Sequence, residues 1–206
     1  LKYFLLGAFA SAFLLYGISF VYGATGTVEL SKIVAAYGLA PSGLLEFGGV
    51  LMMIGLMFKA ALVPFHQWTP DVYQGAPTNV TAFMAAASKI AAIGALYRVM
   101  EACQVFQSLW MPALFWVAIL TMLVPNFLAL VQKDVKRVLG FSSIANAGYV
   151  LVGMISAVQM KSGPGVAVIF LVGYSLTTVG AFTVLSLTAK GAQEGTSFDD
   201  LRGLWR

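Results

Sequence analysis

Residues that usually carry enzyme chemistry are scarce in this chain. Its 206 residues include one cysteine and one histidine, and only 10% are charged. A lone Cys103 cannot form a disulfide, an iron–sulfur site or a zinc site from this chain, and it is more typical of a small apolar packing residue. The sequence also lacks a GxGxxG motif, a P-loop, a CxxC pair and a nucleophile elbow. It therefore predicts no cofactor, metal or hydrolytic site here.

Hydrophobic residues, in contrast, make up 60% of the chain, far more than in a soluble globular domain. They gather in segments of about 20 residues, the length that crosses a bilayer. Because a chain inside a bilayer must satisfy its own backbone hydrogen bonds, these segments predict an all-α integral membrane fold with about six transmembrane helices. The predicted spans are residues 2–21, 44–65, 78–100, 110–132, 135–158 and 165–189.

Two lysines lie inside these spans, Lys59 in the second and Lys89 in the third. A lysine near the bilayer centre costs roughly 2.5 to 3.5 kcal/mol, so both must serve a purpose. Pro64 cannot donate to the carbonyl of Ala60, which predicts that the second span is broken near Pro64, one turn after Lys59. Broken helices mark the ion sites of transporters, so proton or ion movement is the leading explanation. An ordinary kinked helix with a snorkelling lysine is the alternative.

Two stretches carry a specific resemblance, FKAALVPFHQWTPDVYQGAPTNVTAFMAAASKIAA and KDVKRVLGFSSIANAGYVLVG. They resemble the subunit N family of proton-pumping NADH-quinone oxidoreductase, the bacterial respiratory complex I. This antiporter-like family is related to subunits of multisubunit sodium/proton antiporters, and the resemblance extends over nearly the whole chain. It implies that Lys59 and Lys89 are proton-relay residues. The implied function is proton translocation through buried lysines, driven by quinone reduction in partner subunits.

The same resemblance implies which partner subunits, cofactors and membrane surround the chain. NADH, FMN, iron–sulfur clusters and quinone would belong to other membrane and peripheral subunits of the complex, in the bacterial inner membrane. The family has an inverted-repeat fold, so the chain is predicted to be a single membrane-domain fragment. Residues 1–104 would hold the last three helices of the first repeat, and residues 105–206 the first three of the second.

Two other functions stay open. The chain could belong to a multisubunit sodium/proton antiporter or a membrane-bound hydrogenase, which share the lysine pair. It could also be a structural membrane subunit that conducts nothing.

Polar side chains at helical spacing mark one face of each of the last two predicted spans. Such a face either lines a hydrated path or forms hydrogen bonds between helices, and the sequence does not decide between them. The residues are Ser142, Asn146, Tyr149, Tyr174, Thr177 and Thr178.

The only histidine, His66, lies in the connection after the broken span. Imidazole titrates near neutrality, so His66 could pass protons between the cytoplasm and Lys59, or it could cap the broken helix. The positive-inside rule places this connection on the cytoplasmic side. The cations on its side are Lys2, Lys133, Lys136, Arg137, Lys190, Arg202 and Arg206, against Lys32, Arg98 and Lys161 on the other.

Three shorter segments of the sequence also predict local structure. Residues 27–38 have the pattern of a short interfacial helix. Pro125 predicts a second weak point, at the carbonyl of Thr121 in the fourth span. Ser197 and Asp200 have capping-box spacing, which favours a surface helix at the end of the chain.

Overall fold

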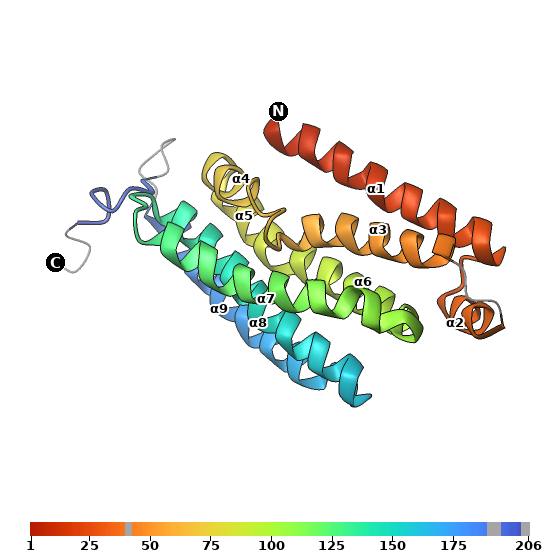
Figure 1. The fold of residues 1–206 in the computed structure, drawn as a ribbon. Helices are drawn as coiled ribbons and strands as arrows, with labels where there is room; N and C mark the ends of the chain where they lie inside the picture. Colours follow the sequence, from red (N-terminus) through yellow and green to blue (C-terminus); the bar gives the residue numbers. More distant parts are fainter. Residues whose placement is uncertain (40–42, 189–194, 203–206) are drawn as a thin grey trace.

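The computed structural model describes residues 1–39, 43–188 and 195–202, and helices make up most of them (Figure 1). Within these residues, six helices are long and apolar enough to cross a membrane. They are α1 (Lys2–Thr25), α3 (Gly43–Ala60), α5 with α6 (Thr78–Phe83 and Lys89–Ala102), α7 (Gln107–Ala129), α8 (Val135–Met160) and α9 (Gly165–Leu187). The predicted all-α integral membrane fold is confirmed, with its spans displaced by only a few residues.

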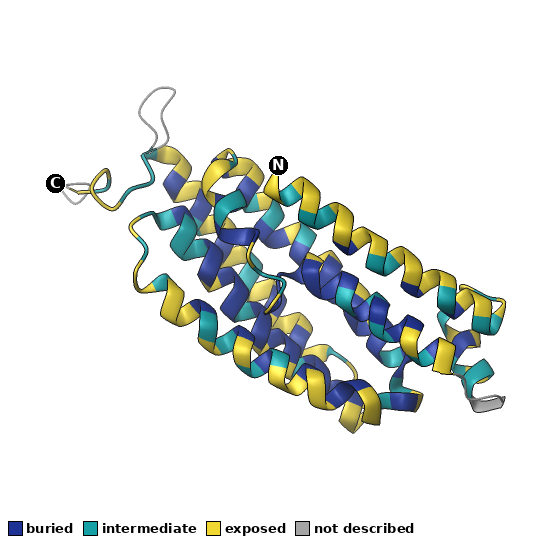
Figure 2. Cartoon of the chain, turned by 45° about the horizontal axis from the view of Figure 1, so that its top comes forward, coloured by how far each residue is buried: buried dark blue, intermediate teal, exposed yellow. Residues whose placement is uncertain are grey.

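Short helical segments join these spans. A π-helix, η1 (Met84–Ser88), makes α5 and α6 one continuous rod, and a 3₁₀ turn, η2 (Gln104–Phe106), leads into α7. The predicted interfacial helix is α2 (Leu30–Leu39), and a further short helix, α4 (Thr69–Gly75), follows the broken span. Buried residues run through the middle of the bundle, whereas α1 is largely exposed (Figure 2).

Glycines allow α1 and α3 to approach closely. A Cβ added to Gly17 would lie 2.6 Å from the backbone nitrogen of Met52, and one on Gly48 would lie 2.9 Å from the carbonyl oxygen of Gly17. Small residues at such crossings let helices pack backbone to backbone in a membrane. The contact packs α1 along α3, the helix whose last turn carries Lys59.

The predicted weak point at Pro125 is not a break, because α7 continues through this proline to Ala129. The Thr121 side chain sits at this position in the interior. Its hydroxyl donates to the carbonyl of Val117 at 2.6 Å and accepts from the backbone N–H of Val63 at 3.0 Å. Prolines are tolerated in membrane helices where neighbouring segments and Thr side chains supply hydrogen bonds. Here Thr121 also ties α7 to the chain that follows α3.

The chain end differs from its prediction. Asp200 accepts a hydrogen bond from the backbone N–H of Ser197 at 3.1 Å, as in a capping box, but residues 198–202 form turns and not a helix. Ser197 instead makes a single antiparallel bridge with Asp134, just before α8. The remaining residues of this predicted helix lie outside the described residues, as do Lys190 and Arg206.

Candidate functional site

The second span is interrupted near Pro64, as predicted, but the helix itself stops earlier. α3 ends at Ala60, one residue after Lys59, and Ala61 takes a left-handed conformation with φ 60°. The indole N–H of Trp68 donates to the carbonyl oxygen of Phe58 at 3.1 Å. The left-handed residue and this side-chain cap end the helix a turn before the proline, which lies exposed in the turns that lead to α4.

Lys59 lies on the outside of the described residues. Its ammonium nitrogen is 5.9 Å from the centre of the Tyr3 ring in α1, within the range of a cation–π contact. The side chain therefore faces α1, away from the helices that surround the other predicted relay lysine.

Lys89 lies in a different environment from Lys59, and it is only 4% exposed. It begins α6 directly after the π-helix, a distortion that is frequent at functional sites. The ammonium donates to the carbonyl oxygen of Ser143 at 2.6 Å and also to the Ser143 hydroxyl. The Tyr174 ring centre lies 5.9 Å from the same nitrogen. One lysine from α6 is thus enclosed by polar groups of α8 and α9.

Ser143 is a site residue that the sequence prediction missed in favour of its neighbour. The structure leaves Ser142 exposed and buries Ser143 to 1% exposure. A signal was available: Gly140 and Ala147 lie at helical spacing on either side of Ser143, and both are buried. This row of small residues marks the inward face of α8.

The predicted polar faces of α8 and α9 meet in a groove of about 550 Å³. Of the six residues predicted there, all but Tyr149 line it. The Tyr149 ring packs instead near Phe170. The hydroxyl of Tyr174 is buried and has no hydrogen-bond partner among the described residues. Tyr174 thus has its ring near Lys89 and also lines the groove, so it lies between the buried lysine and the outside of the bundle.

The sequence analysis counted Lys136 among the surface cations, and the structure shows that it is buried. It is only 2% exposed, and its ammonium donates to the carbonyl oxygen of Ala76 at 2.6 Å, just past the end of α4. The first turns of α8 pack closely on α4, because a Cβ on Gly140 would lie 3.2 Å from the Cα of Pro70. This close packing encloses Lys136, which makes it a second buried lysine beside Lys89.

Asp71 links three helices at the same end of the bundle. Its carboxylate pairs with Lys2 of α1 at 2.5 Å and with Arg137 of α8 at 2.7 Å. The hydrogen bond from Lys2, together with that from Arg137, lowers the pKa of Asp71 although partial burial opposes the shift. Two of the predicted cytoplasmic cations, Lys2 and Arg137, therefore take part in a cross-link between helices.

His66 lies half-buried in the turn after α3, and its Nδ1 atom has no hydrogen-bond partner among the described residues. Its backbone carbonyl accepts from the N–H of Thr69 at 3.0 Å, which helps to start α4. Burial lowers the pKa of His66 below its ordinary value of 6.5. The imidazole is therefore neutral at physiological pH and able to accept a proton.

Six apolar spans, one of them interrupted beside a lysine and another with a lysine enclosed by its neighbours, define a multi-pass membrane protein with a buried cation at membrane depth. Comparison with known families agrees with this class. The family described as "NADH:quinone oxidoreductase/Mrp antiporter, TM" matches residues 1–206, and the chain belongs to it.

Curated relatives give the subgroup that the chain resembles. NADH-quinone oxidoreductase subunit N of Parafrankia sp. (strain EAN1pec) is 48% identical over 211 residues, which cover 100% of this chain and 39% of the relative. The protein of the same name from Mycobacterium tuberculosis (strain ATCC 25618 / H37Rv) is 46% identical, covering 97% of this chain and 38% of the relative. The chain thus spans about two fifths of the length of these relatives.

Solved structures show the same fold. A chain of respiratory complex I from Thermus thermophilus with bound aureothin is 44% identical, with a TM-score of 0.74, over 90% of this chain and 39% of that one. A chain of the archaeal membrane-bound sulfane sulfur reductase is 27% identical with a TM-score of 0.85, over 97% and 41%. The Mrp complex from Dietzia sp. DQ12-45-1b gives 25% identity and a TM-score of 0.78, over 89% and 34%.

Proposed function

We propose that this chain forms part of a proton-translocating membrane subunit of an NADH-quinone oxidoreductase. The observation that carries the proposal is the enclosure of Lys89, which is 4% exposed and has Ser143 and Tyr174 as its polar neighbours. A buried lysine without a carboxylate partner among these contacts is costly in a bilayer. Reversible protonation explains why a lysine is present at this position despite the cost, because such a lysine can accept and release a proton.

Lys59 and His66 serve as the second relay lysine and as the site of proton uptake in this proposal. Lys59 lies in the last turn of α3, directly before the interruption of the span. His66 lies a few residues further on in the same turn region, with a lowered pKa and a buried nitrogen that lacks a partner among the described residues. An imidazole that takes up a proton from the surroundings can then pass it on toward Lys59.

The groove between α8 and α9 provides the hydrated path that leads away from Lys89. Its support is the grouping of hydroxyl and amide side chains along one groove, together with the buried hydroxyl of Tyr174. Polar groups at membrane depth are satisfied by other protein groups or by water. Water in this groove would supply the missing partner of the Tyr174 hydroxyl.

The proposal includes partners and cofactors outside the chain. Other membrane and peripheral subunits of complex I would hold NADH, FMN, the iron–sulfur clusters and quinone, in the bacterial inner membrane. Residues 1–104 and 105–206 would be parts of two inverted repeats. The support is the similarity to subunit N and the share of those relatives that the chain covers.

A sodium/proton antiporter or a membrane-bound hydrogenase is the alternative assignment. The TM-scores favour the sulfane sulfur reductase and the Mrp complex over complex I, but the sequence identity is highest for complex I. Identity is the better guide, because related subunits share one fold and differ in their side chains. The assignment to NADH-quinone oxidoreductase follows from the higher identity.

Replacement of Lys89 tests the function. Lys89→Ala, introduced into the complete protein within its assembled complex, should abolish most proton pumping in sealed vesicles. Lys133→Ala, the same change at an exposed lysine, is the matched control and should pump normally. Normal pumping by Lys89→Ala would instead support a structural subunit that conducts nothing. Sodium-dependent transport without coupling to NADH oxidation would support the antiporter assignment.

A further inference from the structure

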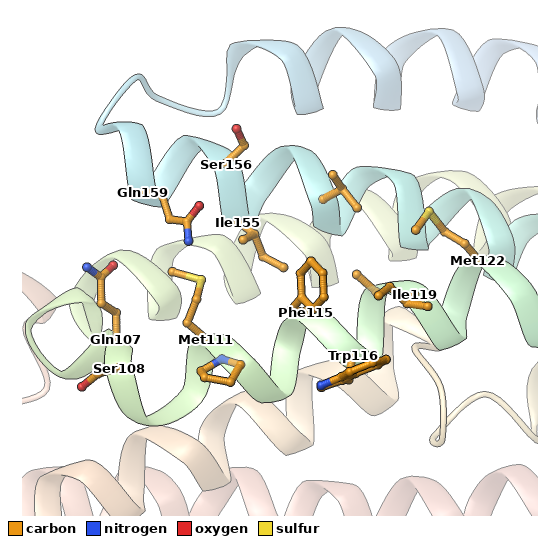
Figure 3. A pocket seen from close by; sticks show the side chains of 13 residues that line it. Gln107, Ser108, Met111, Phe115, Trp116, Ile119, Met122, Ile155, Ser156 and Gln159 are labelled. Atoms are coloured by element: carbon orange, nitrogen blue, oxygen red, sulfur yellow. The ribbon is translucent and has the colours of Figure 1, made fainter.

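A groove of about 840 Å³ lies between α7 and α8, outside the lysine site (Figure 3). Its lining is sorted by polarity along its length. Gln107, Ser108, Ser156 and Gln159 gather at one end, whereas Phe115, Trp116, Ile119 and Met122 follow one another toward the other end. None of the described residues that line it is charged. Such sorting fits a ligand with a polar head and a long apolar tail.

The dimensions fit one leaflet of a bilayer. Gln107 begins α7, and Met122 lies 15 residues further along, about 22 Å at 1.5 Å per residue. Half of a hydrocarbon core of about 30 Å, with the adjoining head-group layer, has a similar depth. The polar end of the groove therefore lies at the membrane surface, and the aromatic end reaches toward the bilayer centre.

The polar end contains an unsatisfied group. The Oε1 atom of Gln107 is buried and has no hydrogen-bond partner among the described residues. A buried acceptor of this kind is unfavourable unless a donor reaches it. Lys161, an exposed cation two residues beyond Gln159, lies at the same end of α8. A fitting occupant therefore offers a hydrogen-bond donor and, beside it, a negative charge.

We propose that this groove binds one phospholipid with an ethanolamine head group. The ammonium of the head group donates to Gln107 Oε1, the phosphate lies toward Lys161, and an acyl chain follows Phe115 and Trp116 toward Met122. A choline head group fits less well, because its quaternary nitrogen has no N–H to donate. By the positive-inside rule this lipid lies in the leaflet opposite the Lys2 and Arg137 end. The site goes beyond proton translocation and does not depend on it.

A lipid competition experiment on the unaltered complex tests the proposal. The complete protein, purified within its complex, is reconstituted with equal amounts of phosphatidylethanolamine and phosphatidylcholine, and the retained lipid is measured by native mass spectrometry. We expect one retained phosphatidylethanolamine that phosphatidylcholine does not replace. Equal retention of the two lipids would overturn the proposal.

Variants then locate the bound lipid. Gln107→Leu removes the acceptor and should weaken phosphatidylethanolamine retention roughly tenfold, the usual effect of losing a hydrogen bond to a charged group. Trp116→Ala should weaken it as well, whereas Phe127→Ala, an exposed aromatic of the same helix outside the groove, should not. Unchanged retention in Gln107→Leu would contradict the site. A photoreactive residue at Phe115 that cross-links to protein rather than to lipid would also contradict it.

Discussion

The two lysines that are predicted to relay protons come from similar apolar stretches and end in opposite surroundings. Lys59 lies in the last turn of α3, where the free carbonyls of a helix end favour a cation, and its side chain is exposed beside Tyr3. Lys89 lies within a continuous helical rod, without such a free end, and is held by Ser143 under the ring of Tyr174. The charge of Lys59 is therefore stabilised by the end of its own helix, whereas the charge of Lys89 depends on side chains of other helices.

This difference assigns separate tasks to the two regions in the proposed mechanism. In this proposal the end of α3, with its turn region and His66, would exchange protons with the surroundings. The enclosed site of α6, α8 and α9 would store and transfer them. Substitutions in the two regions either abolish this contrast or make it measurable.

The largest effect should come from Gly17→Val, which disturbs the packing of α1 on α3, the helix that carries Lys59. Its Cβ would lie 2.6 Å from a backbone atom of α3, so the two helices must separate. Overpacking costs typically 1–3 kcal/mol and more where backbone must move, so we expect about 3 kcal/mol. Thermal unfolding of the purified protein measures the loss. Gly7→Val, at a glycine with nothing nearby, is the control and should unfold normally.

Arginine substitutions compare the two lysines directly. Lys89→Arg keeps the charge but does not release its proton, because guanidinium stays protonated. We expect coupled quinone reduction and pumping to fall roughly 100-fold, the scale of a lost proton-transfer group. Lys59→Arg should be milder, because its exposed position accommodates the larger head. Full coupled activity in assembled Lys89→Arg complexes would remove the protonation role and leave only a need for positive charge.

Ser143→Ala tests the hydrogen bond that distinguishes the Lys89 site. The change removes one acceptor of the ammonium and keeps the backbone carbonyl. The loss of such a charged hydrogen bond should slow pumping roughly tenfold. Ser186→Ala alters an exposed hydroxyl of α9 outside the groove and should leave the rate within twofold of the unaltered protein, on the order of the small effects usual at surface positions. Equal rates in both variants would contradict a role for Ser143.

Asp71→Asn removes the carboxylate that links α1, α4 and α8. This link joins the region of Lys59 to the region of Lys89. Because the folded pKa of Asp71 is lowered, its stabilisation is present above the ordinary value of 3.8 and is lost as the pH falls through the folded value. At neutral pH we expect a loss of about 1 kcal/mol, as for partly exposed ion pairs. Unfolding curves measured from pH 7 down to pH 3 should stay apart above the ordinary value of 3.8 and begin to approach each other only below it.

The smallest effect concerns His66. Its folded pKa lies below the ordinary value of 6.5, so the unfolded chain takes up a proton first as the pH falls. Stability is therefore fully present above about pH 6.5 and declines below it until the folded form also titrates. His66→Gln should lack this decline. Parallel pH profiles of the unfolding midpoint in both proteins would show that His66 does not titrate as described.

The apolar runs determined the spans, because a bilayer requires each segment to satisfy its own backbone and to be about 20 residues long. The sequence also predicted the interruption near Pro64, the lysine in each of two spans and most residues of the α8–α9 groove. These features depend on local composition and on helical spacing, which one chain segment contains by itself.

Only the tertiary structure decided which side of each helix faces inward. α8 is apolar on most sides, so its pattern did not distinguish Ser143 from Ser142, and it did not reveal that Lys136 is buried against α4. The exposure of Lys59 and the enclosure of Lys89 likewise follow from which helices pack beside them. In a membrane the lipid is as apolar as the core, so hydrophobicity places a helix in the bilayer but does not orient it there.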